Sequence, residues 1–402
     1  MYLTNGRLSQ SPKWLYIIVP TLFFAFTGLN FFVAQFLDTT ALIQQEISQK
    51  GELQFLFENL VVFAIFLGLL LLWVKYVHRQ PLVALITARP SISWKRFWFA
   101  FGLWGSITIA MTCIDYLFIS PNDYIWNFQW IPFLKLLVIV VLFIPLQTSF
   151  EEIFFRGYLM QGLGLATRRA WFPLLFTSIT FGLMHIANPE VEKLGYSLLI
   201  YYIGTGLFLG ITTLMDDGLE LALGFHTANN LFTALLVTSD WTVFQVPSIL
   251  RDISEPTLSF SIWMPLILCF PLLLYIYAKK YSWKEWKKKL FKSFFTSKSL
   301  SKCSVTAYSL LCSKDSLGTN LSKLPSKITL PSTAGENSKS LEVSKSFKRS
   351  SLRASVRITS IGPLAGIVPA LKPVMYSLKS VGSLSFWPLF LEQATNRRQA
   401  MR

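Results

Sequence analysis

The side chains that could do chemistry in this chain lie in three short stretches, each in or at the end of an apolar run. These stretches read TSFEEIFFRGY at 148–158, FGLMHIAN at 181–188 and HTANN at 226–230. Only three histidines occur in the sequence, and two of them fall here. The polar members of the set are Glu151, Glu152, Arg156, His185, Asn188, His226, Asn229 and Asn230.

The residue types of this set suit two kinds of chemistry. A carboxylate, two imidazoles and several carboxamides can activate a water molecule and stabilise an oxyanion, which is what hydrolysis of a peptide bond requires. They equally suit a metal site, in which Glu151, His185 and His226 would hold a zinc ion and leave one position open for water. The residues alone leave both alternatives open, and no cofactor is certain.

Helix geometry divides the set into faces. Residues four apart share a face, whereas neighbours are turned by about 100°. Glu152 and Arg156 can therefore form an ion pair, which would partly offset the cost of burying Glu152. Glu151 points elsewhere and has no predicted local partner, as suits a general base. The same spacing groups His185 with Phe181 and Asn188, and it groups His226 with Asn229 or Asn230.

The composition shows which solvent surrounds these groups. Hydrophobic residues make up 52% of the 402 residues, charged residues only 14%, and the mean hydropathy is +0.47. These values indicate a polytopic membrane protein. A charged side chain at membrane depth costs about 2.5–3.5 kcal/mol on translocon scales, so ionisable residues there face a bundle interior or a wet cavity. We expect the three stretches to share one such cavity.

Apolar runs long enough for membrane helices define the fold class, which we predict to be all-α: a bundle of about eight transmembrane helices. The fifth and last runs are the shortest. The first run is flanked by basic residues and is predicted to be a retained span rather than a cleaved signal peptide. The runs are Trp14–Phe36, Gln54–Tyr76, Phe97–Ile119, Phe133–Phe155, Trp171–Ile186, Tyr196–Leu214, Leu219–Val237 and Ile262–Tyr277.

Loop charges predict the orientation of the bundle. The second and fourth loops and the segment KKYSWKEWKKK after the last run are basic, whereas the first, third, fifth and seventh loops carry mostly acidic residues. Both termini are therefore predicted on the cytoplasmic side. His78 lies among the basic residues of the second loop, and we expect it to be an ordinary interfacial side chain.

The chain divides by composition into a body, 1–278, and a basic tail, 279–402, rich in Ser and Lys. The tail holds about two dozen Lys and Arg against about five acidic residues, and it lacks helical or strand periodicity. It is predicted to be mostly disordered, and to be dispensable or else an anchor on anionic lipid or nucleic acid. For the protein as a whole, we expect the lipid bilayer to be a partner, and we do not expect nucleic acid to be one. The four cysteines support neither a disulfide framework nor a zinc finger.

The segments EEIFFR, FGLMH and HTANN resemble the EExxxR, FxxxH and HxxxN motifs of the CPBP family, which comprises CAAX prenyl endopeptidases and bacteriocin-processing or immunity proteins and is also called the Abi family. The motifs lie within about 130–240. The resemblance implies that Glu151 and His185 activate water and that His226 and Asn230 hold the oxyanion. Glu152, Arg156 and Asn188 would have supporting roles. It implies either a glutamate or a metalloprotease mechanism.

Depth along the helices poses a problem for this assignment. Glu151 lies near the predicted end of the fourth run, whereas His185 lies about 22 Å along the fifth helix from Ala170. Straight spans would not bring the two together. We therefore predict that helix four extends past the membrane surface through GYLMQGL or that helix five starts outside the bilayer.

The sequence favours an intramembrane endopeptidase that cleaves a membrane-associated protein or peptide, prenylated or not, near its C-terminus or its membrane-proximal segment. A membrane scaffold or bacteriocin-immunity protein of the same fold is the first alternative. A proton-linked transporter is a weaker one, because its polar residues would follow a path across the bilayer rather than cluster. The substrate, the membrane and the oligomeric state are not predicted.

Overall fold

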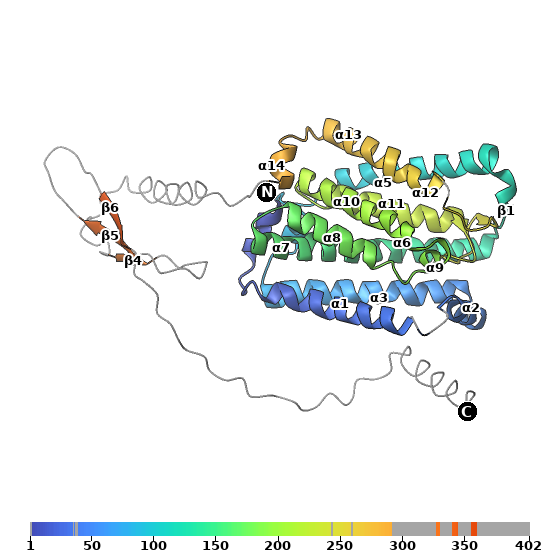
Figure 1. Ribbon diagram of the computed structural model, residues 1–402, viewed down its shortest axis with the longest axis horizontal. Coiled ribbons are helices and arrows are strands. Elements are labelled where there is room, and N and C mark those ends of the chain that lie inside the picture. The colour runs from blue at the N-terminus through green and yellow to red at the C-terminus, as the bar shows by residue number, and fades with distance from the viewer. Residues whose placement is uncertain are drawn as a thin grey trace, which may run out of the picture. The chain divides into compact units, whose positions relative to one another are not determined.

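The structure is a computed structural model that describes residues 2–291 except 35, 37, 38, 243 and 259, together with three short strands further along the chain. Its contacts divide the chain into two compact units, Met1–Val305 and Thr306–Arg402. The first unit contains every predicted site residue. Figure 1 shows its helices lying alongside one another as a bundle.

Helices account for nearly all of the first unit. The α-helices are α1 (Leu15–Ala34), α2 (Thr39–Lys50), α3 (Glu52–Leu72), α4 (Val83–Ile86), α5 (Trp94–Ile114), α6 (Trp130–Glu152), α7 (Met160–Thr167), α8 (Trp171–Leu183), α9 (Pro189–Leu194), α10 (Leu199–Asp216), α11 (Glu220–Leu236), α12 (Phe260–Met264), α13 (Phe270–Lys280) and α14 (Trp286–Phe291). Tighter 3-10 turns are η1 (Tyr2–Leu8), η4 (Pro121–Asp123) and η6 (Tyr196–Leu198). Wider π-helical turns are η2 (Trp73–His78), η3 (Asp115–Ile119), η5 (Ile153–Leu159) and η7 (Pro265–Cys269).

All eight predicted apolar runs form helices, which confirms the all-α polytopic fold. Among the described residues, six helical segments are long and apolar enough to cross a membrane: Leu15–Val33, Glu52–His78, Trp94–Ile119, Trp130–Thr167, Tyr196–Asp216 and Ile262–Lys280. The other two helices, α8 with 13 residues and α11 with 17, are shorter than a full span. The bundle therefore combines six helical segments of spanning length with two shorter helices.

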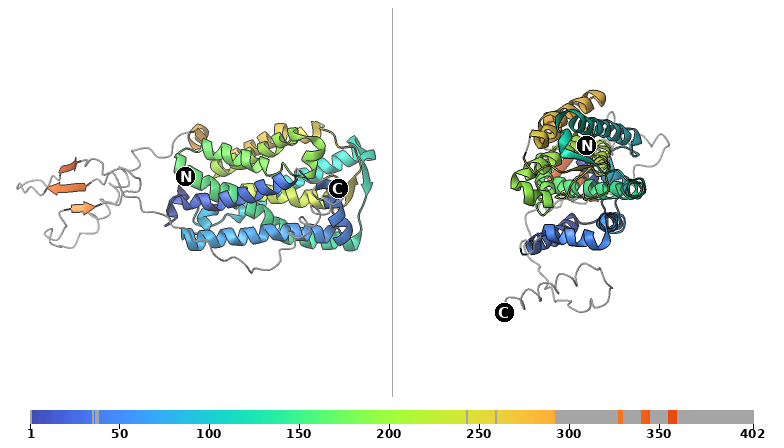
Figure 2. Two further views of the ribbon diagram at one scale, coloured as in Figure 1. Left: turned by 60° about the horizontal axis from the view of Figure 1, so that its bottom comes forward. Right: turned by 90° about the vertical axis from the view of Figure 1, so that its right-hand side faces the viewer.

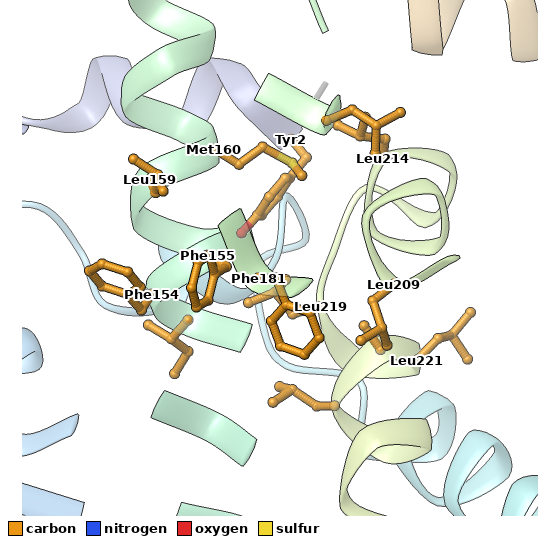
Figure 3. Packing of buried hydrophobic residues seen from close by; sticks show 14 of the residues in the cluster. Tyr2, Phe154, Phe155, Leu159, Met160, Phe181, Leu209, Leu214, Leu219 and Leu221 are labelled. Atoms are coloured by element: carbon orange, nitrogen blue, oxygen red, sulfur yellow. The ribbon is translucent and has the colours of Figure 1, made fainter. Parts of the chain in front are cut away.

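Exposed apolar side chains and buried core side chains lie on different parts of the bundle. Large apolar side chains of α1 and of the first half of α6 are exposed, as expected for contact with lipid, including Leu22, Phe26, Leu134 and Val138. The core gathers where η5, α8, α10 and α11 meet. Figure 3 shows Phe155 and Phe181 there, with ring centroids 5.5 Å apart and edge-to-face, beside Leu209 and Leu221.

Close helix contacts depend on small residues. Helices α5 and α11 pack along much of their lengths, as do α8 and α10. At Gly224 of α11, a Cβ atom would collide with the backbone carbonyl of Phe97 in α5. At Gly206 of α10, a Cβ atom would lie 2.8 Å from the carbonyl oxygen of Ser178 in α8. Glycine therefore lets these backbones approach, as is usual between membrane helices.

Two small features of the first unit were not predicted. The connections at one end of the bundle form a three-stranded sheet of β1 (Tyr124–Trp126), β3 (Leu250–Asp252) and β2 (Val237–Thr238) in that order. Strand β3 pairs antiparallel with β1 and parallel with β2. The connection between α1 and α3 contains α2, and both views in Figure 2 place α1 and α3 side by side. Short strands and a polar helix in the loops give no signal among long apolar runs.

The second unit contains an antiparallel sheet of β4 (Lys327–Thr329), β5 (Ser340–Ser344) and β6 (Ser355–Thr359), with β5 in the middle. Most of the predicted disordered tail, 279–402, lies outside the described residues. The prediction of a boundary after 278, and of disorder beyond it, stays a prediction.

Candidate active site

One continuous helical segment of 38 residues, Trp130–Thr167, carries the first motif. It consists of α6, η5 and α7, so the fourth helix extends through GYLMQGL and ends at Thr167. Glu151 lies 16 residues before this end, about 24 Å, and His185 lies 15 residues after Ala170, about 22 Å. A turn of three residues reverses the chain between them. The two side chains are therefore at similar depth along the bundle, and the fourth helix continues through GYLMQGL, whereas its passage beyond the membrane surface stays a prediction.

The ion pair predicted from the four-residue spacing is present and fully buried. Nη1 of Arg156 lies 2.8 Å from Oε1 of Glu152, and neither side chain is exposed. Nη2 of Arg156 donates to the carbonyl oxygen of Gly206 in α10 at 3.2 Å. The guanidinium carbon lies 4.3 Å from the ring centre of Phe181 in α8, a cation–π contact. Arg156 thereby links three helices around the site.

His226 lies between the two glutamates. Its Nδ1 atom is 2.8 Å from Oε1 of Glu152, and its Nε2 atom is 3.5 Å from Oε2 of Glu151. Because an ionised carboxylate only accepts hydrogen bonds, Nδ1 carries the hydrogen on the Glu152 side. The pair formed by Glu152 and Arg156 therefore fixes the ring of His226 and directs Nε2 at Glu151.

Glu151 has a partner on its own helix, which corrects the expectation that it has none. Nε2 of Gln147 donates to Oε1 of Glu151 at 2.9 Å. Oε1 of Gln147 in turn accepts from Nδ2 of Asn230 at 3.3 Å. The four-residue spacing of Gln147 and Glu151 was the sequence signal for this contact. Gln147 joins the first and third motifs.

The two asparagines of the third motif have different roles in the structure. Asn230 contacts Gln147 and accepts from Nδ2 of Asn229 at 3.1 Å. Asn229 accepts from the indole Nε1 of Trp104 in α5 at 3.1 Å. The hydrogen bonds thus run in one direction from Trp104 through both asparagines and Gln147 to Glu151, which defines the orientation of each carboxamide. Asn229 makes an interhelical bond, and Asn230 is the one nearer the carboxylate.

His185 follows the last turn of α8 and is half-buried. Its Nδ1 atom lies 3.0 Å from the carbonyl oxygen of Phe181, one turn earlier. The ring of Phe181 contacts both imidazoles, with centroid distances of 5.2 Å to His185 and 5.9 Å to His226. A single phenylalanine therefore contacts both histidines.

Asn188 forms its hydrogen bond away from this cluster, and His185 is linked to the cluster through the ring of Phe181. The Nδ2 atom of Asn188 donates to Oε1 of Glu190 at 2.9 Å, away from Glu151. The same carboxylate oxygen accepts from the hydroxyl of Tyr202, whose ring stacks on His185. Sequence reasoning missed Glu190 and Tyr202, because no spacing within one helix connects them to His185.

The fit of the site to a metal ion can be tested on its donors. Among the residues that the structure describes, no three His, Cys, Asp or Glu side chains are close enough to hold a metal ion together. Nδ1 of His226 is bound to Glu152 and Nδ1 of His185 faces a backbone carbonyl, so each ring has only Nε2 to offer. Among the described residues, the possible ligand set of Glu151, His185 and His226 is not assembled as a zinc site, and the metal and glutamate mechanisms both stay alternatives.

The third histidine, His78, is fully buried rather than interfacial, which corrects the prediction for it. Its Nε2 atom lies 2.8 Å from the hydroxyl of Tyr158, and its Nδ1 atom lies 2.6 Å from Oγ of Ser11. The ring also packs on Tyr16, with centroids 4.2 Å apart. His78 therefore joins the N-terminal segment to η5 and lies outside the candidate site.

The fold and the site together define a multi-pass integral membrane protein with a cluster of carboxylates, imidazoles and carboxamides inside its bundle. Residues 130–232 match the family described as "Type II CAAX prenyl endopeptidase Rce1-like". This range contains all three motifs and confirms the predicted resemblance to the CPBP family.

One curated relative is similar to the chain over part of its length. It is "Uncharacterized protein YyaK" of Bacillus subtilis (strain 168), which is 33% identical over 178 residues. The similar region makes up 44% of this chain and 59% of that relative, so the chain spans less than two thirds of the relative's length. No solved structure matches the chain.

Proposed function

We propose that this protein is an intramembrane endopeptidase. Its substrate would be a membrane-associated protein or peptide, cleaved near its C-terminus or in its membrane-proximal segment by CAAX-type processing or a related reaction. The match of residues 130–232 to a prenyl endopeptidase family supports the reaction class. The observation that carries the proposal is the 3.5 Å approach of Nε2 of His226 to Oε2 of Glu151 inside the bundle.

In the proposed reaction, Glu151 accepts a proton from water as the water oxygen attacks the carbonyl carbon of the scissile bond. Nε2 of His185 bears a lone pair in the tautomer set by the Phe181 carbonyl and orients the same water. Glu151 then passes its proton to the leaving amine. The bond to the amide nitrogen breaks, and a carboxylate and an amine are released.

The developing oxyanion needs hydrogen-bond donors. In its doubly protonated form, His226 donates from Nδ1 to Glu152 and offers its Nε2 hydrogen to the oxyanion. Asn230 offers the second hydrogen of Nδ2, because the first is directed at Gln147. Glu152 and Arg156 support the reaction through His226. Burial of the cluster shields the charged groups, so water must enter from one side.

We also propose that both termini face the cytoplasmic side, because the basic loops and the basic segment after α13 favour that side. A substrate attached to the membrane, with or without a prenyl group, would then reach the site from within the bilayer. The alternative role as a scaffold or immunity protein predicts no cleavage at all.

The test is cleavage, followed by mass spectrometry, of a prenylated C-terminal peptide, a leader-type peptide and a membrane-anchored reporter. Purified wild type is compared with Glu151→Ala, His185→Ala, His226→Ala and Asn230→Ala. The first two changes are expected to abolish cleavage without unfolding the protein. The last two are expected to lower turnover by a factor of about 10²–10³, as for loss of an oxyanion donor.

Wild-type rates in the Glu151→Ala variant would contradict the proposed role of Glu151. Absence of cleavage of every substrate by folded wild type would favour the scaffold or immunity role. Thermal unfolding in detergent, measured for each variant, separates loss of chemistry from loss of structure.

A further inference from the structure

The ring of Tyr202 in α10 stacks on the imidazole of His185. Their centroids are 4.0 Å apart and their planes differ by 14°. The centroid separation is smaller than in any of the contacts of Phe181 with the two imidazoles. Since such a stack leaves the ring edge free, it restricts the plane of His185 without covering its Nε2 atom.

Tyr202 is itself held in place by a buried carboxylate. Its hydroxyl donates to Oε1 of Glu190 in α9 at 2.8 Å, and Nδ2 of Asn188 donates to the same oxygen at 2.9 Å. The side chain of Glu190 is buried, so these hydrogen bonds are shielded from water. Glu190 thus connects the end of α8, the short α9 and α10 around the histidine.

Two constraints therefore act on one imidazole. The stack with Tyr202 sets the plane of the ring, and the hydrogen bond from Nδ1 to the carbonyl of Phe181 sets its rotation and its tautomer. A carbonyl oxygen only accepts, so Nδ1 bears the hydrogen and the lone pair of Nε2 faces away from α8.

We propose that Tyr202, held by Glu190, is a positioning residue that keeps Nε2 of His185 aligned for water activation. The proposal rests on the proposed endopeptidase function. It assigns a use to Tyr202, Glu190 and Asn188, none of which touches the reacting atoms. Asn188 then acts through Glu190 rather than on the substrate.

The kinetic test compares three changes in the full-length protein. Tyr202→Leu keeps apolar volume but removes the stacking plane, and we expect kcat to fall about tenfold with KM changed less than about twofold, because misplacement of a reacting group affects the chemical step. Tyr202→Phe keeps the stacking ring but loses the hydrogen bond to Glu190, so its kcat should lie between those of Tyr202→Leu and wild type. Tyr277→Leu is the matched control, since Tyr277 of α13 is a buried tyrosine whose ring packs on Phe99 and Trp283.

Equal losses of kcat in Tyr202→Leu and Tyr277→Leu, or no rescue by Tyr202→Phe, would overturn the positioning role. A general packing defect would also lower the unfolding temperature of Tyr202→Leu in step with its activity. The proposal expects kcat to fall more than stability does.

A second measurement does not depend on activity. Diethyl pyrocarbonate modifies the unprotonated imidazole nitrogen, and the chain has only three histidines, so mass spectrometry can follow each one. In Tyr202→Leu the modification rate of His185 should rise about threefold or more as its ring is released, whereas buried His78 serves as the internal reference.

An unchanged modification rate of His185 in Tyr202→Leu would overturn the proposal even if the protease assignment holds. A raised modification rate of His185 in Tyr202→Leu, together with no cleavage of any substrate by wild type, would support the contact of Tyr202 with His185 as a restraint on the ring. The same result would contradict the proposed endopeptidase function. The two measurements therefore distinguish failure of this inference from failure of the proposed function.

Discussion

Oε1 of Glu152 lies 2.8 Å from Nδ1 of His226, and the same oxygen binds Arg156 of its own helix. One carboxylate oxygen therefore serves a structural ion pair and an imidazole of the candidate site together. We therefore expect the stability of the bundle and the orientation of His226 to depend on the same atom.

Replacing Arg156 tests this dependence. Arg156→Met would leave Glu152 buried without its cation, and we expect a loss of about 3–5 kcal/mol in the free energy of unfolding. Addition of Glu152→Gln should recover part of that loss, because the buried charge is then gone. The measurement is unfolding in detergent for both single variants and the double variant.

The control for Arg156→Met is Lys288→Met, which breaks an exposed ion pair with Glu285 of equal length, 2.8 Å. This change should alter stability by no more than about 1 kcal/mol, as exposed pairs contribute little. Similar losses of unfolding free energy in Arg156→Met and Lys288→Met would contradict the view that burial makes the Arg156 ion pair important for stability.

Gln147 offers a test of how Glu151 is held. Gln147→Leu removes the hydrogen bonds to Glu151 and Asn230, and we expect turnover to fall about tenfold because the carboxylate is no longer aligned. Gln54→Leu is a matched control. Gln54 also donates to a glutamate four residues later, Glu58, at 2.9 Å, but on α3 away from the site. Turnover of the control variant should equal that of wild type.

Gly224 tests the close approach of α5 and α11. Gly224→Ala would force its Cβ against the carbonyl of Phe97, so the helices must separate. We expect a loss of about 1–3 kcal/mol in stability and lower activity, since α11 carries His226. Gly102→Ala on α5 meets no atom within 4 Å and should be neutral. Equal unfolding temperatures for the two variants would show that this contact is not tight.

Removal of metal tests the choice between mechanisms. Because no three donors of the described residues are gathered, we expect a chelator to leave the rate of substrate cleavage unchanged. The measurement is the cleavage rate after dialysis against the chelator, with zinc added back to one portion. Loss of cleavage that zinc restores would instead favour a metalloprotease, with the ligands brought together by substrate.

The sequence predicted those features that depend on spacing within one helix. Glu152 and Arg156 pair because they are four positions apart, and each of the eight predicted apolar runs is helical. Counting residues from Ala170 to His185 showed that straight spans would not bring His185 to Glu151, so one of the two helices had to extend. These inferences use only helix rise and helix period, which tertiary contacts leave unchanged.

Contacts between helices could not be predicted from the sequence. The stack of Tyr202 on His185 joins α10 to the end of α8, and the bond from Trp104 to Asn229 joins α5 to α11. His78 appeared interfacial because its sequence neighbours are basic, yet it is buried by Tyr158 and Ser11 from other parts of the chain. The surroundings of each of these side chains depend on tertiary packing, which no local sequence pattern reveals.

The π-helical turn η5 lies directly after Glu152 in the long segment Trp130–Thr167. Such a turn holds one residue more than an α-helical turn, so everything after it is rotated by about 100° relative to an unbroken α-helix. The half before it presents Glu151 and Glu152 to His226, and α7 after it packs on η1 at the N-terminus. The extra residue of η5 thus lets one continuous helix present different faces before and after the turn. The face before it carries the glutamates of the candidate site, and the face after it packs against the N-terminal segment.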